Sequence, residues 1–139
     1  LRQGLKFKHV EQQVFHLPDR IDGTPKKSGV VPAIDLNVRD RNQLYMIEYS
    51  GYVKVPRSGR HRLTLWSTGA KLFLDQDTVI APNVLAPQVT ARDLCLESGY
   101  HPIRLVTRMF LQPSHVLELY WEGPGTGRQI IPAHAFYHD

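Results

Sequence analysis

The sequence predicts an all-β protein: an antiparallel β-sandwich formed by a single domain, residues 1–139. Several short segments alternate apolar and polar residues with a period of two, as a half-buried strand does. Ten prolines and ten glycines supply turn geometry between these segments. No window of 11 residues shows a 3.6-residue period with helix caps. Many short strands separated by turns are typical of a sandwich.

The stretch 51–75 is the part around which we expect the rest to be organised. Residues 51–55 are extended, and residues 56–59 (Pro-Arg-Ser-Gly) form a turn. In residues 61–66, leucines alternate with polar residues, which predicts a second strand, and residues 71–74 predict a third. We therefore expect a hairpin followed by a third strand, with a tight loop at 67–70. Any binding site is expected near that loop.

The remaining elements follow in chain order. Residues 17–29 are dense in turn formers and predict an extended connection, while residues 77–92, with Pro82 and Pro87, predict a loop with a short strand inside it. The glycine-rich run 122–127 predicts a turn. The further strands are expected at 4–10, 30–36 (an edge strand because of Pro32), 44–55 (with a bend at Ser50 and Gly51), 78–80, 94–96, 99–106 and 115–121, and residues 129–137 close the chain.

Composition limits the function classes. The formal charge of +4 and the pI of about 9.4 indicate a mildly basic surface, but lysine and arginine are spread out and no nucleic-acid-binding signature is present. The only cysteine, Cys95, lies in an apolar run, which favours a buried, inert thiol. No apolar run reaches 18 residues, so no membrane-spanning helix is expected. The chain lacks an initiator methionine, and we expect it to be part of a longer protein.

Catalytic and metal signatures are missing from the sequence. The seven histidines have no spacing typical of zinc ligands, and no nucleophile elbow is present. Asp75 and Asp77 flank a predicted turn and offer too few oxygens for Ca²⁺ by themselves. We therefore expect no enzyme, no catalytic residue and no cofactor.

Three features are candidates for a binding surface, each with two interpretations. A cationic group on the predicted hairpin is either a solvated strand edge or an anionic-glycan patch. The run 108–113 contains Met109, Phe110 and Leu111, which either plug the core or are displayed to a partner. Trp66 and Trp121 either stack on sugar rings or pack in the core. The cationic group consists of Lys54, Arg57, Arg60 and Arg62.

Seven sequence pieces resemble, in order, the protective-antigen-type domain (PA-fourteen). They are Gly-Leu near the start, Phe15-x-Leu17-Pro18, Gly51-Tyr52-Val53-Lys54-Val55-Pro56 with Ser58-Gly59, Lys71-Leu72-Phe73-Leu74-Asp75, Gly99-Tyr100-His101-Pro102-Ile103-Arg104, Leu117-x-Leu119-x-Trp121-Glu122-Gly123-Pro124-Gly125, and Ile131-Pro132. The resemblance covers about residues 5–137. It implies an antiparallel β-sandwich, usually a non-catalytic module of secreted glycosidases, sulfatases, adhesins and toxins, whose best-understood role is carbohydrate binding.

The chain departs from this family at one position that matters. In the sugar-binding adhesin members, two adjacent aspartates before the Lys-Leu-Phe-Leu-Asp-like strand hold Ca²⁺, which grips sugar hydroxyls. Ser67 and Thr68 occupy those positions here. Neutral hydroxyls are poor replacements for two carboxylates around a hard divalent cation. The sequence therefore predicts no metal at this loop.

Two functions are expected from the resemblance and the residues together. The first is metal-independent glycan binding in an extracellular or cell-surface protein, with no nucleic acid and no membrane span involved. The second is a structural module that has lost sugar binding and contacts a neighbouring domain or protein through Met109, Phe110 and Leu111. For the glycan site, the expected ligand-binding residues are Trp66, Ser67, Thr68, Gly69, Asn83, Arg108, Phe110 and His115.

Overall fold

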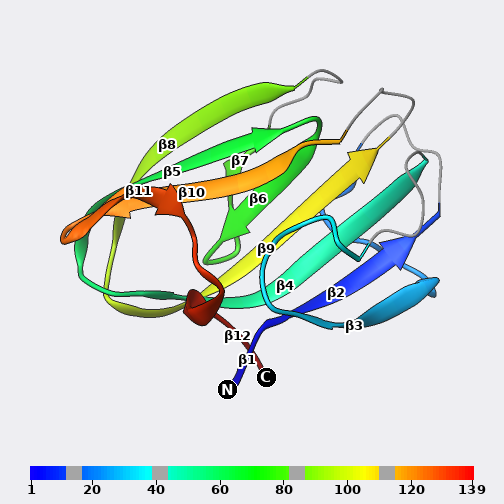
Figure 1. Ribbon diagram of the computed structural model, residues 1–139, viewed down its shortest axis with the longest axis horizontal. Helices are drawn as coiled ribbons and strands as arrows, with labels where there is room; N and C mark the ends of the chain where they lie inside the picture. Colours follow the sequence, from blue (N-terminus) through cyan, green and yellow to red (C-terminus); the bar gives the residue numbers. More distant parts are fainter. Residues whose placement is uncertain (12–16, 39–43, 82–86, 110–114) are drawn as a thin grey trace.

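The computed structural model describes residues 1–11, 17–38, 44–81, 87–109 and 115–139, and within them two antiparallel sheets pack face to face (Figure 1). The predicted all-β sandwich is confirmed. The large sheet contains β1 (Arg2–Gln3), β12 (Phe136–His138), β4 (Tyr45–Val55), β9 (Gly99–Met109), β6 (Ala70–Leu74) and β7 (Asp77–Ile80), together with β2 (Leu5–Val10) and β3 (Lys27–Val31). The small sheet contains β11 (Thr126–Ile130), β10 (Leu117–Gly123), β5 (Gly59–Ser67) and β8 (Gln88–Leu96). A short 3₁₀ turn, η1 (Ala133–Ala135), precedes β12.

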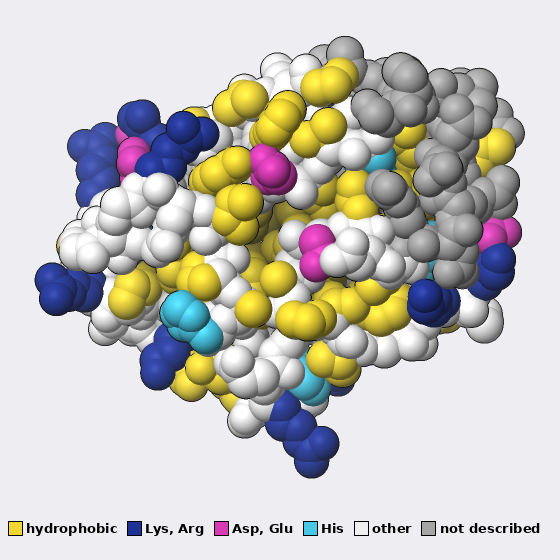
Figure 2. Space-filling view, in the orientation of Figure 1, with side chains coloured by type: hydrophobic (Ala, Val, Ile, Leu, Met, Phe, Trp, Pro, Cys, Tyr) yellow, Lys and Arg dark blue, Asp and Glu magenta, His cyan; other side chains and the backbone are white. Residues whose placement is uncertain are grey.

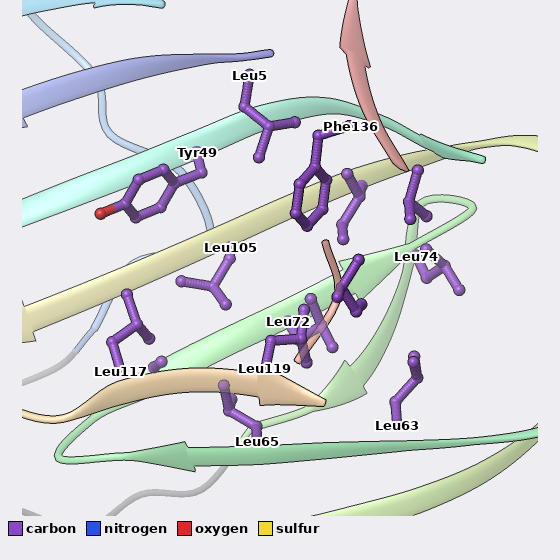
Figure 3. Packing of buried hydrophobic residues seen from close by; sticks show 14 of the residues in the cluster. Leu5, Tyr49, Leu63, Leu65, Leu72, Leu74, Leu105, Leu117, Leu119 and Phe136 are labelled. Carbon is purple, nitrogen blue, oxygen red and sulfur yellow. The ribbon is translucent and has the colours of Figure 1, made fainter. Parts of the chain in front are cut away.

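The core lies between the two sheets. Inward-facing leucines of β5, such as Leu63 and Leu65, meet Leu72 of β6 and Leu105 of β9, and Figure 3 shows these side chains converging from both layers. Each of them is almost fully removed from water. Burial of one such side chain stabilises the fold by about 1.5 to 3 kcal/mol. The two-residue period of residues 61–66 therefore predicts correctly that Leu63 and Leu65 share the buried face of their strand.

The predicted hairpin in 51–66 is wrong. β4 pairs with β2, β9 and β12 in the large sheet, whereas β5 pairs with β8 and β10 in the small sheet. The turn at 56–59 therefore carries the chain across the sandwich, and residues 67–70 carry it back to β6 (Figure 1). Both strands point leucine or valine into the same core. Local alternation cannot distinguish this crossing from a hairpin, because both put apolar side chains on one face of each strand.

β8 is a nine-residue strand where the sequence predicts a loop with a strand only at 94–96. It is an edge strand of the small sheet, paired with β5 alone, and most of its side chains are exposed. An edge strand exposed in this way carries no apolar periodicity for a sequence pattern to detect. Cys95 lies in β8 and is exposed, so the expectation of a buried thiol is also wrong.

Other strand boundaries differ by a few residues. β3 begins at Lys27 and ends at Val31, before Pro32, so the predicted 30–36 strand is shifted. β9 continues to Met109, which places Arg108 and Met109 in a strand and not in a loop. The predicted turn after β6 is confirmed, because Asp75 and Gln76 both have positive φ values, of 53° and 68°, as a tight hairpin turn requires.

Gly51 marks the point at which β4 changes its partner along one edge. Residues 46–50 of β4 pair with β2, and residues 52–53 pair with β12. A Cβ atom on Gly51 would lie 2.2 Å from the carbonyl oxygen of Tyr137. Only a residue without a side chain permits this close approach of β12.

The charged residues are dispersed over the visible face. Figure 2 shows hydrophobic side chains gathered in a hollow across its middle, with lysine and arginine in separate groups towards the margins. The described part of the chain contains no helix with the length and hydropathy of a membrane span.

His101 links two turns at one end of the sandwich. Its Nδ1 lies 2.9 Å from both carboxylate oxygens of Asp75, and its Nε2 lies 2.6 Å from the carbonyl oxygen of Glu97. Both partners accept hydrogen bonds, so the ring satisfies both only when each nitrogen carries a proton. Burial lowers the pKa of His101, but the hydrogen bonds to Glu97 and Asp75 outweigh it, and the pKa of His101 is raised above its ordinary value.

We expect this link to make stability depend on pH. A pKa raised in the folded state stabilises the fold fully below the ordinary histidine pKa of about 6.5, and this contribution is lost as the pH rises through the folded-state pKa. Urea unfolding between pH 5.5 and pH 8.5 should show a larger loss of stability in the wild type than in His101→Gln. Parallel pH profiles of the two proteins would contradict the link.

Candidate functional site at one end of the sandwich

The strand register brings three predicted segments to the same end of the sandwich. At the end of β5, Ser67 is opposite Leu117 of β10. At the start of β6, Ala70 is opposite Thr107 of β9. Residues 67–70, 107–109 and 115–117 therefore meet, and we call this part of the molecule the loop end.

Backbone hydrogen bonds hold the 67–69 segment in place. The N–H of Thr68 donates to the carbonyl oxygen of Val116 at 3.2 Å, and the N–H of Val116 donates to Thr68 Oγ1 at 3.4 Å. The N–H of Arg108 donates to the carbonyl oxygen of Gly69 at 3.1 Å. The segment is thus tied to β9 on one side and to the residue preceding β10 on the other.

A chain of side-chain hydrogen bonds runs beneath this segment. Thr107 Oγ1 donates to the carbonyl oxygen of Gly69 at 2.8 Å, so its lone pairs accept from His115 Nε2 at 2.9 Å. His115 Nδ1 lies 2.5 Å from the hydroxyl of Tyr45, which completes the chain. In this arrangement His115 carries a proton on Nε2. The ring of His9 stacks on Tyr45 at 5.4 Å between centroids. We call Tyr45, His115, Thr107 and Gly69 the polar chain.

The predicted hydroxyl residues lie below the surface. Ser67 is 1% exposed and Thr68 and Thr107 are fully buried. Ser67 Oγ finds no hydrogen-bond partner among the described residues. Arg108 is also buried, and burial lowers the pKa of its guanidinium. His115 is half-buried. The described residues of the loop end therefore form a floor, with His115 as its most accessible predicted member.

Five of the predicted ligand-binding residues come together at the loop end, one lies elsewhere, and two fall outside the described residues. Ser67, Thr68, Gly69, Arg108 and His115 lie within this one cluster of contacts. Trp66 is 38% exposed and lies on the outer face of the small sheet, opposite Val89 and Glu118. Asn83 and Phe110 lie outside the described residues.

The proposed display of Met109 to a partner is not supported. Met109 is 2% exposed and packs in the main core, because it shares the inward face of β9 with Leu105. Of the two interpretations of this run, Met109 therefore fits the one in which it plugs the core. Leu111 lies outside the described residues. Trp121 likewise packs in the core, at 6% exposure.

Sequence reasoning missed three members of this end: His9, Tyr45 and Thr107. Each occupies an inward-facing position near the end of its strand, in β2, β4 and β9 respectively. A signal was available in the sequence. Each of the three is a polar residue at a position where the alternation of its strand predicts an inward-facing apolar side chain. Most buried polar side chains have hydrogen-bond partners, so such a residue indicates a polar contact at that place.

The predicted cationic group does not form one surface. Arg60 and Arg62 lie on the small sheet and both pair with Asp93 of β8, with Arg62 Nε 2.8 Å from Asp93 Oδ1. The hydrogen bond from Arg62 lowers the pKa of Asp93. Lys54 lies on the large sheet, where its Nζ is 5.5 Å from the ring centre of Tyr100. The arginine charge is partly neutralised, which favours a solvated strand edge over an anionic-glycan patch.

Of the described residues at the loop end, Ser67 and Thr68 are poor ligands for Ca²⁺. Ser67 and Thr68 are neutral and buried, and Thr68 Oγ1 already accepts from the backbone. Among the described residues, no three histidine, cysteine, aspartate or glutamate side chains are grouped as metal ligands would be. Ca²⁺ requires six to eight oxygen ligands, and its affinity rises with their charge.

Protein-family models and curated proteins give no match to the chain, whereas solved structures do. The PA14 sugar-binding domain from an RTX adhesin superimposes with a TM-score of 0.77 at 11% identity, covering 100% of each chain. The PA14 domain of the antifreeze protein MpAFP gives a TM-score of 0.75 at 12% identity, covering 96% of this chain and 89% of that one. This chain has the PA14 fold.

A longer chain also superimposes on this one over part of its length. An anti-sigma factor domain-containing protein from Clostridium clariflavum superimposes with a TM-score of 0.79 at 20% identity, covering 99% of this chain and 49% of that one. The chain therefore spans about half the length of that protein. At these identities the likeness is one of fold.

Proposed function

We propose that this PA14-fold chain is a non-catalytic module that binds a neutral glycan at the loop end without a metal ion. The whole-chain likeness to a sugar-binding PA14 domain supports the class of ligand. The proposed site lies where strands of both sheets end. Binding sites on β-sandwiches commonly lie at such strand ends. An extracellular or surface location is part of the same proposal.

The proposal that no metal ion is needed rests on the hydrogen bonds of the polar chain. In this chain, the segment that bears Ser67, Thr68 and Gly69 is positioned by hydrogen bonds from Thr107, Arg108 and Val116. A segment fixed in this way is held in shape before a ligand arrives, which lowers the ordering cost of binding. The proposal assigns Ser67, Thr68 and Gly69 to the floor of the site and His115 to its edge. Contacts from Arg108, Asn83 and Phe110 stay part of the proposal, whereas Trp66, on the outer face of the small sheet, is left out of it.

A glycan array read with and without EDTA tests this function. We expect binding that survives the chelator and that falls about tenfold in His115→Ala, the loss that follows when about 1.4 kcal/mol is removed from binding. The control Thr78→Ala replaces an exposed side chain of β7 and should bind as the wild type does. Circular dichroism of both variants establishes that they are folded.

Two outcomes would contradict the proposal. Binding abolished by EDTA would show that a cation is required. A blank array, with a protein partner recovered by the same chain in a pull-down, would favour the structural module instead. The second function has one observation behind it, namely the burial of Ser67 and Thr68.

A further inference from the structure

A cleft lies at the other end of the small sheet, away from the loop end. It has a volume of about 330 Å³ and opens between β11, η1 and the turn that follows β4. Figure 1 shows these three elements on the side opposite the ends of β5 and β9. Trp121 lines the cleft and is opposite Leu63, four residues along β5 from Ser67. Four residues of a strand span about 13 Å, so the two places are separate.

The walls of the cleft are apolar and partly aromatic. They include Trp121 and Tyr137 together with Pro56 and Pro132. The ring of Tyr137 is held by Tyr100, which meets it edge to face at 5.1 Å between centroids. Trp121 is nine-tenths buried, and its indole Nε1 finds no acceptor among the described residues. A buried donor without an acceptor is costly, so a ligand oxygen that reached this nitrogen from the cleft would offset that cost.

The rim of the cleft carries polar side chains but no carboxylate among the described residues. Gln129 and Thr126 offer neutral donors and acceptors, and Lys54 offers an ammonium group. No carboxylate is among the described residues that line the cleft, so a divalent cation has no charged ligand there. A volume near the lower end of the range for ligand clefts suits one small ring and not an extended chain.

We propose that this cleft binds a single neutral pyranose ring. A pyranose presents an apolar C–H face, which matches the aromatic and proline walls, and a girdle of hydroxyls, which matches Gln129 and Thr126. The inference goes beyond the proposed function, because it places a second sugar-binding position on the molecule that shares no residue with the loop end.

Nitrogen-15 NMR tests the inference directly, because the chain contains two tryptophans and therefore two indole N–H signals. The probes are methyl β-glucopyranoside, methyl β-galactopyranoside and methyl α-mannopyranoside, with glycerol as a non-cyclic polyol control. We expect at least one glycoside to move the Trp121 signal saturably while the Trp66 signal stays still, and glycerol to move neither. Trp66→Phe assigns the two signals.

Variants of the cleft sharpen the test. Gln129→Ala changes an exposed side chain and should weaken the glycoside about fivefold, which corresponds to about 1 kcal/mol. Tyr137→Ala should abolish the Trp121 shift. No saturable Trp121 shift with any of the three glycosides would overturn the inference, and so would equal shifts of both indoles. If array binding is still lost in His115→Ala, the loop-end proposal stands although the proposal for the cleft has failed.

Discussion

Replacing Gly51 with alanine is expected to destabilise the domain by about 3 kcal/mol or more, the upper part of the range for overpacking a closed site. The new Cβ would lie 2.2 Å from the carbonyl oxygen of Tyr137 and 2.8 Å from Leu5 Cδ2. The first contact is with backbone, which cannot rotate away as a side chain can. β12 must therefore move off β4, and its pairs at Tyr52 and Val53 are lost. Urea unfolding followed by circular dichroism measures the change.

Gly99→Ala is the matched control for this substitution. Gly99 also has a positive φ, of 119°, but nothing lies within 4 Å of the position its Cβ would take. Its substitution adds backbone strain without a clash. It is expected to cost clearly less than Gly51→Ala. If the two variants lose equal stability, the close approach of β12 does not decide the choice of glycine at 51.

Thr107→Val is the second substitution with a large expected effect, about 2 kcal/mol of folding stability. Valine has the shape of threonine but removes the hydroxyl that joins Gly69 to His115. His115 Nε2 then loses its partner in the polar chain, and the carbonyl oxygen of Gly69 keeps only the N–H of Arg108. Because the 67–69 segment is then held less firmly, glycan binding should fall as well. Urea unfolding and the glycan array measure the two effects.

Two controls separate the hydroxyl from the methyl group of Thr107. Thr107→Ser keeps the hydroxyl and should cost only about 1 kcal/mol, the value of one buried methyl group. Thr78→Val makes the same chemical change at an exposed position and should stay within about 0.5 kcal/mol of the wild type. A Thr107→Val protein as stable as the wild type would show that the polar chain contributes nothing.

The sequence predicted the sandwich and the apolar face of the inner strands, because a period of two is a direct record of burial on one side. Leu63 and Leu65 are examples, since both proved to be core residues. The prediction of strands failed where a strand is exposed on both faces and therefore shows no such alternation. β8 has solvent around most of its side chains, so it showed no alternation, and the same exposure explains the wrong expectation for Cys95.

The two tryptophans show why the residue type alone was insufficient to predict whether a side chain faces the core or the solvent. Both lie in strands of the small sheet, but Trp121 faces inward with Leu119 and Leu117, whereas Trp66 occupies the alternate position between Leu65 and Ser67 and faces outward. Their positions in the alternation therefore decide the outcome. The same parity places Thr107 and Tyr45 inside, and this was the part of the candidate site that the sequence reasoning overlooked.

The sequence brought Ser67, Thr68, Gly69, Arg108 and His115 together through the family resemblance, and the strand register agrees with that grouping. The sequence did not show how deeply these side chains are buried. Whether a hydroxyl at a strand end reaches the surface depends on the loops from other strands that pack over it. That information is distributed over segments far apart in the chain.

The passage of the chain from β4 to β5 and back to β6 has a consequence for how the domain is made. Because the chain crosses between the layers from β4 to β5, β5 to β6, β7 to β8, β8 to β9, β9 to β10 and β11 to β12, neither complete layer can assemble from one continuous piece of the polypeptide, and closing distant loops must come before most of the favourable contacts. Folding is therefore expected to be slow and all-or-none. A newly made chain would have to wait until nearly its last residue before it gained any lasting structure.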